Sequence, residues 1–425
     1  MLKDNLFLII KRVISSAGIM SIGKIIQLIV LLLAAKEMGV REFGAFSIAL
    51  AIAQFSTFIF IPGGQQGVTK IVTRFFSSKR YQELSNVIIF YILIFLLVTL
   101  LVIFSNQVTN KFNFEEIKYI SNLLVLLIPI TIWTIIREGI SRGFSYVVLS
   151  QAPHELVSPI LILFILIFSN GFLLSAYDFA LIWFLSYMLI EIVLVTTLVF
   201  LNFKSIKRIT LNFNIRDWLD DLIIIQISNL TRVCILRTDI IATGLILGVS
   251  EAGLYSIAQR LAQPITLIAR TIFAATGYLV TKFFEQKNFT MLYQNLLITT
   301  IFALITGILY VLVVFIAGET FLELVDEAYL DAFPILLVLS VALFFDCLSS
   351  PSNQFLLICG FPKMLISVNI IGIILYLLII FYPIANNLLI NIALAVLIPL
   401  SLISIFCMLF SHISIRKLIK KSNVQ

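Results

Sequence analysis

Charged residues are scarce in this sequence. Lysine, arginine, aspartate and glutamate together make up 12% of 425 residues, against about 25% in ordinary soluble domains. Apolar residues reach 61%, so the few charges could not cover the surface that a soluble fold leaves exposed. The composition therefore excludes a soluble globular protein, and it also excludes disordered and collagen-like chains. It predicts a protein that crosses a membrane several times.

Proline is scarce too, with 10 residues in the chain, and the apolar runs are long and unalternating, as at 123–136 and 296–316. A membrane-spanning helix needs about 20 mostly apolar residues, whereas a barrel strand needs about 10 alternating ones. The runs therefore predict an all-α protein with about twelve transmembrane helices. The candidate spans lie near 13–35, 44–68, 86–105, 119–140, 155–171, 178–201, 222–246, 253–280, 292–316, 332–350, 364–382 and 388–410.

Motifs for metal, redox or nucleotide chemistry are missing. The four cysteines stand apart in apolar stretches without metal-ligand or redox spacing, which is typical of small buried apolar residues: Cys234, Cys347, Cys359 and Cys407. The sequence also has no Gly-Lys-Ser/Thr loop for a phosphate. We therefore expect no metal, no cofactor and no ATP hydrolysis by this chain. A proton or sodium gradient would then be the energy source for any coupled transport.

Positive charge is distributed unevenly along the chain. With twelve spans both termini lie on one side, where the tails and loops hold nineteen lysines and arginines, against four in the opposite loops: Lys36, Arg41, Lys111 and Lys118. Basic residues concentrate in cytoplasmic loops. Both termini of this multi-pass protein are therefore predicted to be cytoplasmic, in a bacterial inner membrane. The net charge of +7 follows from these loops and does not indicate a nucleic-acid partner.

A segment repeats at half the length of the chain. Residues 38–54 and 247–263 share nine identities in seventeen positions at a constant offset of 209. Each segment joins the first and second helices of a six-helix set, which predicts two parallel six-helix lobes, residues 1–205 and 206–425. We interpret Gly39 and Gly248 as helix ends. We interpret Gly44 and Gly253 as residues that let the chain turn back sharply.

The segment 247–258, with the sequence LGVSEAGLYSIA, follows a helix that contains Arg237-Thr238-Asp239. This pattern resembles that of the O-antigen and polysaccharide flippases (Wzx type), in the superfamily that also contains the multidrug (MATE) exporters and the lipid II flippase. The resemblance implies a MATE-like fold with two lobes around a central cavity. It further implies that an undecaprenyl-pyrophosphate-linked oligosaccharide repeat unit is moved to the periplasmic leaflet by alternating access. The implied partners are this glycan lipid, membrane lipids and the polysaccharide polymerase machinery.

Ionisable residues inside the predicted spans are the candidate site. Such a residue costs several kcal/mol near the bilayer centre, so it normally faces a cavity or a partner. Five central cations stand against one central acid, Asp239, and this excess suits the roughly two negative charges of a pyrophosphate, or an acidic sugar. The alternative for each cation is a structural ion pair, or a side chain that snorkels to the membrane interface. The candidate substrate-binding residues are Lys24, Arg232, Arg237, Arg260 and Arg270.

Three acids in the spans are candidates for binding a coupling ion or for acting as charge partners: Asp239, Glu191 and Asp346. A buried, hydrogen-bonded acid is the alternative for Glu191 and Asp346. His154 and Glu155 stand between two prolines, which predicts a loop near a membrane edge. Residues 62–67 predict a helix break, either facing a cavity or, as we favour, at a cytoplasmic helix end.

Two other functions fit a chain of many apolar helices. One is a membrane-embedded O-antigen polymerase or glycosyltransferase, but such enzymes resemble one another in a large outer loop, and the outer loops here, near 106–118 and 317–331, are short. The other is a multidrug exporter of the same superfamily. Its cargo is typically cationic, which would require acids where this sequence has an excess of cations.

The charge asymmetry predicts the side on which each loop lies. Single-cysteine labels at Ser78, Ser205 and Ser422 should be cytoplasmic, and labels at Asn113 and Ala328 should be periplasmic. The measurement is reaction with a membrane-impermeant thiol reagent in intact cells. Labelling of any of the first three positions from outside would overturn the orientation.

Overall fold

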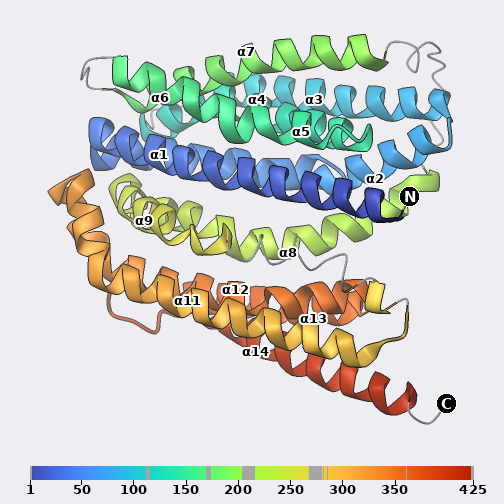
Figure 1. Ribbon diagram of the computed structural model, residues 1–425. Coiled ribbons are helices and arrows are strands. Elements are labelled where there is room, and N and C mark those ends of the chain that lie inside the picture. Colours follow the sequence, from blue (N-terminus) through green and yellow to red (C-terminus); the bar gives the residue numbers. More distant parts are fainter. Residues whose placement is uncertain are drawn as a thin grey trace. The chain divides into compact units, whose positions relative to one another are not determined.

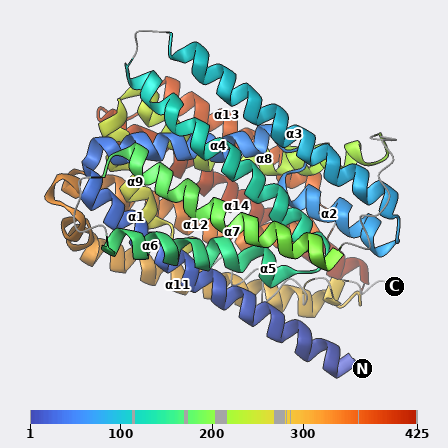
Figure 2. The same ribbon diagram turned by 90° about the horizontal axis from the view of Figure 1, so that it is seen from above.

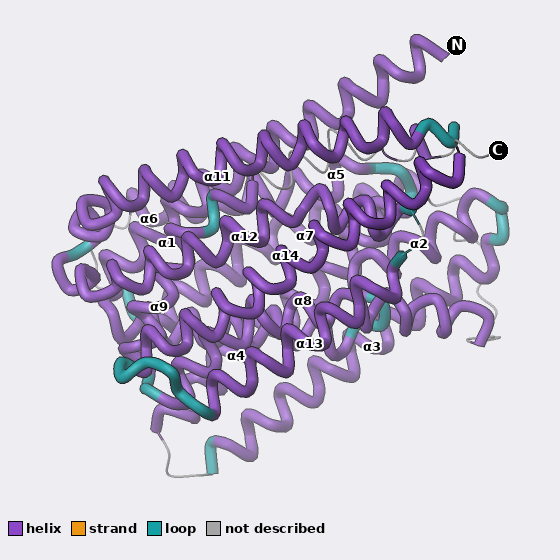
Figure 3. Tube along the Cα trace, turned by 90° about the horizontal axis from the view of Figure 1, so that it is seen from below, coloured by secondary structure: helices purple, strands orange, loops and turns teal. Residues whose placement is uncertain are grey.

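The computed structural model describes residues 2–111, 115–168, 174–202, 216–267, 280, 282–284, 286–359 and 361–422. These residues form helices joined by short turns and contain no strand (Figure 3). The predicted all-α class is thereby confirmed. By internal contacts the chain divides into two compact units. One unit comprises residues 18–253, and the other comprises residues 1–17 and 254–425. The six-helix lobes 1–205 and 206–425 stay a prediction.

In the 18–253 unit, helix α4 contacts α2, α3 and α7. It lies between α3 and α7, which do not lie side by side (Figure 2). Helices α1 and α9 each extend into the other unit. The elements are α1 (Leu2–Phe60), α2 (Gly64–Ser77), α3 (Tyr81–Thr109), α4 (Glu115–Gly143), α5 (Val147–Ala152), the π-helical turn η1 (Pro153–Val157), α6 (Ser158–Phe168), α7 (Ala176–Asn202), α8 (Arg216–Ile246) and α9 (Val249–Ala262).

The 254–425 unit is a bundle in which α12 contacts α11, α13 and α14 (Figure 1). Two of these helices contain an internal proline: Pro351 lies inside α12 and Pro399 inside α14. The elements are α11 (Phe289–Val325), the 3₁₀ turn η2 (Glu327–Ala332), α12 (Phe333–Ile358), α13 (Pro362–Phe381) and α14 (Leu388–Ser422).

Within the described residues, nine helical segments are long and apolar enough to cross a membrane. Their outer faces are apolar, as at Leu100 of α3, which is 66% exposed, and Ile316 of α11, which is 79% exposed. A helical surface of this kind is stable only against lipid. The multi-pass membrane class is therefore confirmed. The predicted span 44–68 is interrupted: its helix ends at Phe60, residues 61–63 turn the chain, and α2 starts at Gly64.

The glycines of the repeat have two different roles. Gly39 interrupts α1 with a φ of 72°, and Gly248 separates α8 from α9 with a φ of 108°. Both angles lie in the region that favours glycine, so the prediction that these two glycines end helices is confirmed. The prediction that Gly44 and Gly253 let the chain turn sharply is wrong, because both are helical.

Gly44 and Gly253 instead allow the two copies of the repeat to touch. A Cβ added at Gly44 would lie 2.0 Å from the carbonyl oxygen of Val249, and one added at Gly253 would lie 2.1 Å from that of Val40. Val40 and Val249 are themselves related by the repeat offset of 209. The contact is therefore reciprocal, and the two hairpins cross with local twofold symmetry at a distance that only glycine permits.

Glu42, in the first copy of the repeat, fastens this hairpin to its own unit. Its Oε2 accepts a hydrogen bond of 2.5 Å from the Tyr119 hydroxyl of α4 and one of 2.8 Å from the backbone N–H of Ala176. Ala176 begins α7, where a carboxylate is favoured by the helix dipole. Neighbouring Arg41 pairs with Glu116 at 3.2 Å on the surface. The kinked segment of α1 and the first turns of α4 and α7 are thus held together.

Filling the glycine crossing should destabilise the fold. Gly253→Ala and Gly44→Ala each place a methyl group against backbone that cannot move independently, so we expect a loss of about 1–3 kcal/mol, and more for Gly253→Val. Protein abundance in membranes and the melting temperature in detergent measure it. Ser250→Val, on the exposed face of the same helix, is the control and should leave both unchanged. If Gly253→Val also leaves both unchanged, the packed crossing is not required.

Candidate functional site

Buried and part-buried ionisable side chains gather in the 18–253 unit, where α1, α4, η1 and α7 each contribute at least one. We call this group the charge cluster; its members are Lys24, Arg137, Glu138, His154, Glu155 and Glu191. Three acids face Lys24, Arg137 and His154, so the side chains balance in charge when His154 is protonated and leave one excess negative charge when it is not.

Glu191 of α7 lies at the centre of this cluster and is 2% exposed. Its Oε1 accepts from Arg137 Nε at 3.1 Å and contacts His154 Nε2, while its Oε2 accepts from Trp133 Nε1 at 2.9 Å. A buried carboxylate without such donors would cost several kcal/mol. Two donors from α4 and one from the π turn therefore fix Glu191 in place. These contacts are of the kind expected for a charge partner, which is one of the two roles predicted for Glu191. Its role in ion coupling stays a prediction.

Arg137 of α4 connects three elements and is 2% exposed. Besides Glu191, it donates from Nη1 to the carbonyl oxygens of Leu149 and Ser150 at 3.3 and 3.1 Å. Both carbonyls belong to α5, so one guanidinium joins α4, α5 and α7. The planar, permanently charged fork of arginine suits such divergent acceptors better than lysine would.

The prediction of a loop at His154 and Glu155 is wrong. Pro153–Val157 forms a π-helical turn between α5 and α6, and His154 is buried at 6% exposure. The imidazole stacks on the Tyr187 ring with 4.6 Å between centroids. Prolines suggested a loop, but the wider π turn accommodates the chain without ending the helical path. Such turns recur at functional sites, and this one presents two ionisable side chains to the cluster.

Lys24 of α1 is the most accessible cation of the cluster. Its Nζ lies 2.9 Å from Glu155 Oε2 and donates to Gln27 Oε1 at 2.8 Å. The Lys24 and Glu155 side chains are 32% and 20% exposed. Next to Lys24, a Cβ added at Gly23 would lie 1.7 Å from the carbonyl oxygen of Glu155. The backbone of α1 therefore packs directly on the π turn, which holds this ion pair in register.

The predicted helix break at residues 62–67 is confirmed, and it supplies one more polar group. Gly63, with a φ of 74°, turns the chain into α2, and the Tyr91 hydroxyl donates to the Pro62 carbonyl at 2.9 Å. Gln65 in the first turn of α2 then donates to the Glu138 carboxylate of α4. The break thus directs a side-chain amide towards the cluster. The membrane side on which it lies stays a prediction.

The other predicted residues are distributed between the units. In the 18–253 unit, Arg237 of α8 is half-buried, and Asp239 is 1% exposed with Oδ1 accepting from the Ile240 N–H at 2.8 Å. The Arg232 side chain lies outside the described part of that helix. In the 254–425 unit, Arg260 of α9 and Asp346 of α12 are both buried. Arg270 lies outside the described residues.

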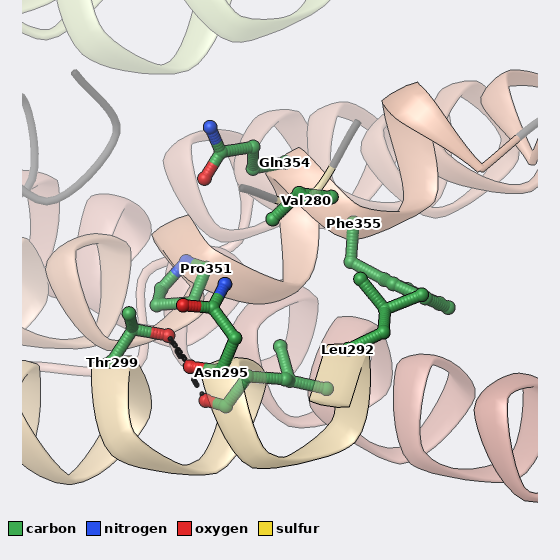
Figure 4. A pocket seen from close by; sticks show the side chains of 8 residues that line it. Val280, Leu292, Asn295, Thr299, Pro351, Gln354 and Phe355 are labelled. Atoms are coloured by element: carbon green, nitrogen blue, oxygen red, sulfur yellow. Dashed lines mark hydrogen bonds between the residues drawn. The ribbon is translucent and has the colours of Figure 1, made fainter. Parts of the chain in front are cut away.

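The 254–425 unit also contains a small crevice between α11 and α12 (Figure 4). Thr299 donates back to the carbonyl oxygens of Asn295 and Leu296 at 2.8 and 3.0 Å, so its hydroxyl is engaged within its own helix. The lining is apolar and amide, without a charged side chain, and therefore does not suit an anion. It consists of Val280, Leu292, Asn295, Leu296, Thr299, Pro351, Gln354 and Phe355.

Sequence reasoning identified Lys24 and Glu191 but missed most of their partners. Arg137 and Glu138 lie inside the predicted span 119–140, where two adjacent charges were themselves a signal, since charges in a span need partners. The neighbouring prolines led the sequence analysis to place His154 and Glu155 in a loop and not among the partners of Lys24 and Glu191. The missing information was spatial, because 54 residues separate Arg137 from Glu191.

Comparison with known proteins supports this description. The model of the family "Polysaccharide biosynthesis protein" matches residues 9–278. The chain is similar to an inward-facing multidrug resistance MATE family transporter of the MOP superfamily, with a TM-score of 0.72 and 14% identity over 94% of this chain and 96% of that one. The outward-facing conformation of a MATE family transporter gives 0.64 and 14%, over 96% of each chain. No curated protein matches.

A third similar structure is a MOP superfamily transporter from Pyrococcus furiosus, whose binding pocket is described as having reverse polarity that suggests a different function. Its TM-score is 0.63 at 15% identity, over 96% of each chain. Identities this low show a common fold and not a common cargo. The predicted MATE-like fold is thereby confirmed.

Breaking the central pair should destabilise the protein more than breaking a surface pair. Arg137→Met or Glu191→Met leaves a buried charge without its partner, so we expect each to cost about 3–5 kcal/mol. The double variant should regain part of this loss because both charges are gone. Melting temperatures in detergent measure the order.

Arg80→Gln is the matched control, because it breaks the exposed pair of Arg80 and Glu83 at 2.7 Å. We expect it to cost less than about 1 kcal/mol. A double variant that melts below both single variants would contradict the pairing as the source of stability.

Proposed function

The chain belongs to the polysaccharide biosynthesis protein family, and on that premise we propose that it moves an undecaprenyl-pyrophosphate-linked oligosaccharide repeat unit from the cytoplasmic to the periplasmic leaflet. The match to that family over residues 9–278 is the observation that carries the proposal. The MATE-like fold supplies a scaffold known from transporters that are solved facing inward and outward. Alternating access is the mechanism that this pair of states supports.

The family and the fold make the chain a membrane transporter of polysaccharide biosynthesis and not an enzyme. The polymerase or glycosyltransferase alternative therefore falls away. A multidrug exporter stays as the second candidate, because the similar solved structures include multidrug resistance transporters. The five cations singled out from the sequence favour an anionic cargo over a cationic one. The proposed cargo therefore carries its charge on a pyrophosphate or on acidic sugars.

The proposed contacts to the cargo are made by the five cations singled out from the sequence. Lys24 supports this role by its exposure, because a group that is 32% exposed can reach a ligand without unfolding its surroundings. Arg237 is half-buried, which lowers the local dielectric and strengthens a charge-assisted hydrogen bond to phosphate oxygen. The remaining three, Arg232, Arg260 and Arg270, complete the proposal on sequence grounds.

The proposed setting is a bacterial inner membrane with both termini in the cytoplasm, where lipid-linked repeat units are assembled. The polymerase machinery on the periplasmic side would then receive the cargo. Coupling to a proton or sodium gradient is proposed for Asp239, Glu191 and Asp346, all of which are buried acids. Buried acids suit this role because their protonation changes the charge inside the protein.

Removing single cations should reduce export without removing the protein from the membrane. For Lys24→Ala, Arg237→Ala and Arg270→Ala we expect a loss of about 1.5–3 kcal/mol of interaction, which is roughly a ten- to hundredfold weaker binding of cargo. Arginine-to-lysine variants should recover part of the loss, and arginine-to-glutamate variants should be worse than alanine. The measurement is surface glycan exported per molecule of inserted protein.

Arg41→Ala is the control, because Arg41 pairs with Glu116 on the exposed hairpin and should export normally. A purely structural ion pair predicts a different result, namely lower abundance that is rescued when the acidic partner is neutralised too. Export at the wild-type rate by all three alanine variants would end the cationic-site proposal.

A further inference from the structure

We propose that Glu155 is a built-in substitute for the cargo anion: it holds Lys24 when the site is empty, and a phosphate oxygen of the cargo displaces it. This inference rests on the proposed function, since it takes Lys24 as a contact to the cargo. It adds Glu155, which the sequence analysis placed in a loop, to the proposed cargo-binding site. It also gives the site a mechanism for releasing its cargo.

The Lys24–Glu155 pair and the Arg137–Glu191 pair differ in accessibility. The side chains of Arg137 and Glu191 are 2% and 3% exposed, and further donors and acceptors surround them. The side chains of Lys24 and Glu155 are 32% and 20% exposed at a separation of 2.9 Å. A part-exposed pair is worth little because water screens it, so an incoming anion can replace it. The buried Arg137–Glu191 pair cannot exchange one partner for a ligand without leaving an unpaired buried charge.

Lys24 can change partners without losing its position. An ammonium group has three donors, and one of them is directed to Gln27 Oε1 at 2.8 Å. Gln27 lies one helical turn beyond Lys24 on the same helix, so it stays in reach when Glu155 leaves. The lysine therefore stays anchored to α1 while a phosphate oxygen takes the place of the Glu155 carboxylate.

Glu155 in turn stays close when it is displaced. Its backbone carbonyl packs against Gly23, at a distance where a Cβ would clash at 1.7 Å. Its neighbour His154 is held by Glu191 and by the Tyr187 ring. The displaced carboxylate thus remains beside Lys24, near the other two acids of the cluster, and repels the bound anion. The return of Glu155 to Lys24 would then assist cargo release.

The test is binding of undecaprenyl pyrophosphate to the purified full-length chain in detergent. Glu155→Gln should tighten binding about twofold to fivefold, the range for removing a competing part-exposed ion pair. Export per molecule should fall in the same variant because release is slower. Inorganic pyrophosphate is titrated as a competitor, which separates recognition of the headgroup from recognition of the lipid chain.

Lys24→Ala identifies the partner through which Glu155 acts. Lys24→Ala alone should weaken binding about tenfold or more, and Glu155→Gln should give no tightening in that background. Glu155→Asp retains the charge on a shorter side chain, so it should tighten binding less than Glu155→Gln; it also serves if the glutamine variant does not accumulate. Glu116→Gln, which breaks the exposed Arg41 pair, controls for the loss of one negative charge and should have no effect.

The outcomes separate the two proposals. If Lys24→Ala weakens binding but neither Glu155 variant tightens it, the exchange is wrong and the proposed function stands. If Glu155→Gln tightens binding equally with and without Lys24, the effect is general repulsion and the exchange is again wrong. If Lys24→Ala leaves binding unchanged, Lys24 is not a contact to the cargo and both proposals lose this residue.

Discussion

The charge of Glu191 must be compensated inside an apolar helical bundle, and the geometry around it follows from that requirement. No water in the hydrocarbon layer can solvate a carboxylate, so donors must come from the protein. Arg137 and Trp133 of α4 and His154 of the π turn provide them. Each donor belongs to an element that contacts α7. The same contacts that solvate the charge therefore fix the register of α4, η1 and α7.

Fixing the π turn also positions Glu155, and through it the cation of α1. The buried Arg137–Glu191 pair, which supplies rigidity, thus lies beside the part-exposed Lys24–Glu155 pair, in which Lys24 can exchange its partner. The turn at Pro153–Val157 carries both Glu155, which pairs with Lys24, and His154, which contacts Glu191. The contacts of Glu191 therefore also place the Lys24–Glu155 pair. Preorganisation of this kind lets a site meet an anion without reorganising the backbone.

The class of fold could be predicted from composition and apolar runs because the bilayer imposes a minimum length on every spanning helix. The repeat could be found because the two copies share nine of seventeen residues. One of these is the glycine at Gly39 and Gly248, where a positive φ restricts the residue type. The role of Gly44 and Gly253 could not be found, because it depends on a backbone that comes close only in the folded chain. Likewise Lys24 and Glu191 were visible as charges in spans, whereas Glu155 and Arg137 became partners only through packing. Periodicity carries no information on which distant segment fills a given face.

The central claim is that this transporter carries a lipid-linked glycan, and the most direct test is translocation in a defined membrane. Purified protein is reconstituted into liposomes that contain an undecaprenyl-pyrophosphate-linked oligosaccharide with a fluorescent label on the sugar. An impermeant quencher added outside then follows the labelled sugar as it crosses from one leaflet to the other. The account predicts crossing well above the rate of protein-free liposomes and competition by unlabelled glycan lipid. Crossing at the protein-free rate, with or without an ion gradient, in liposomes where the same protein transports a cationic dye would contradict it.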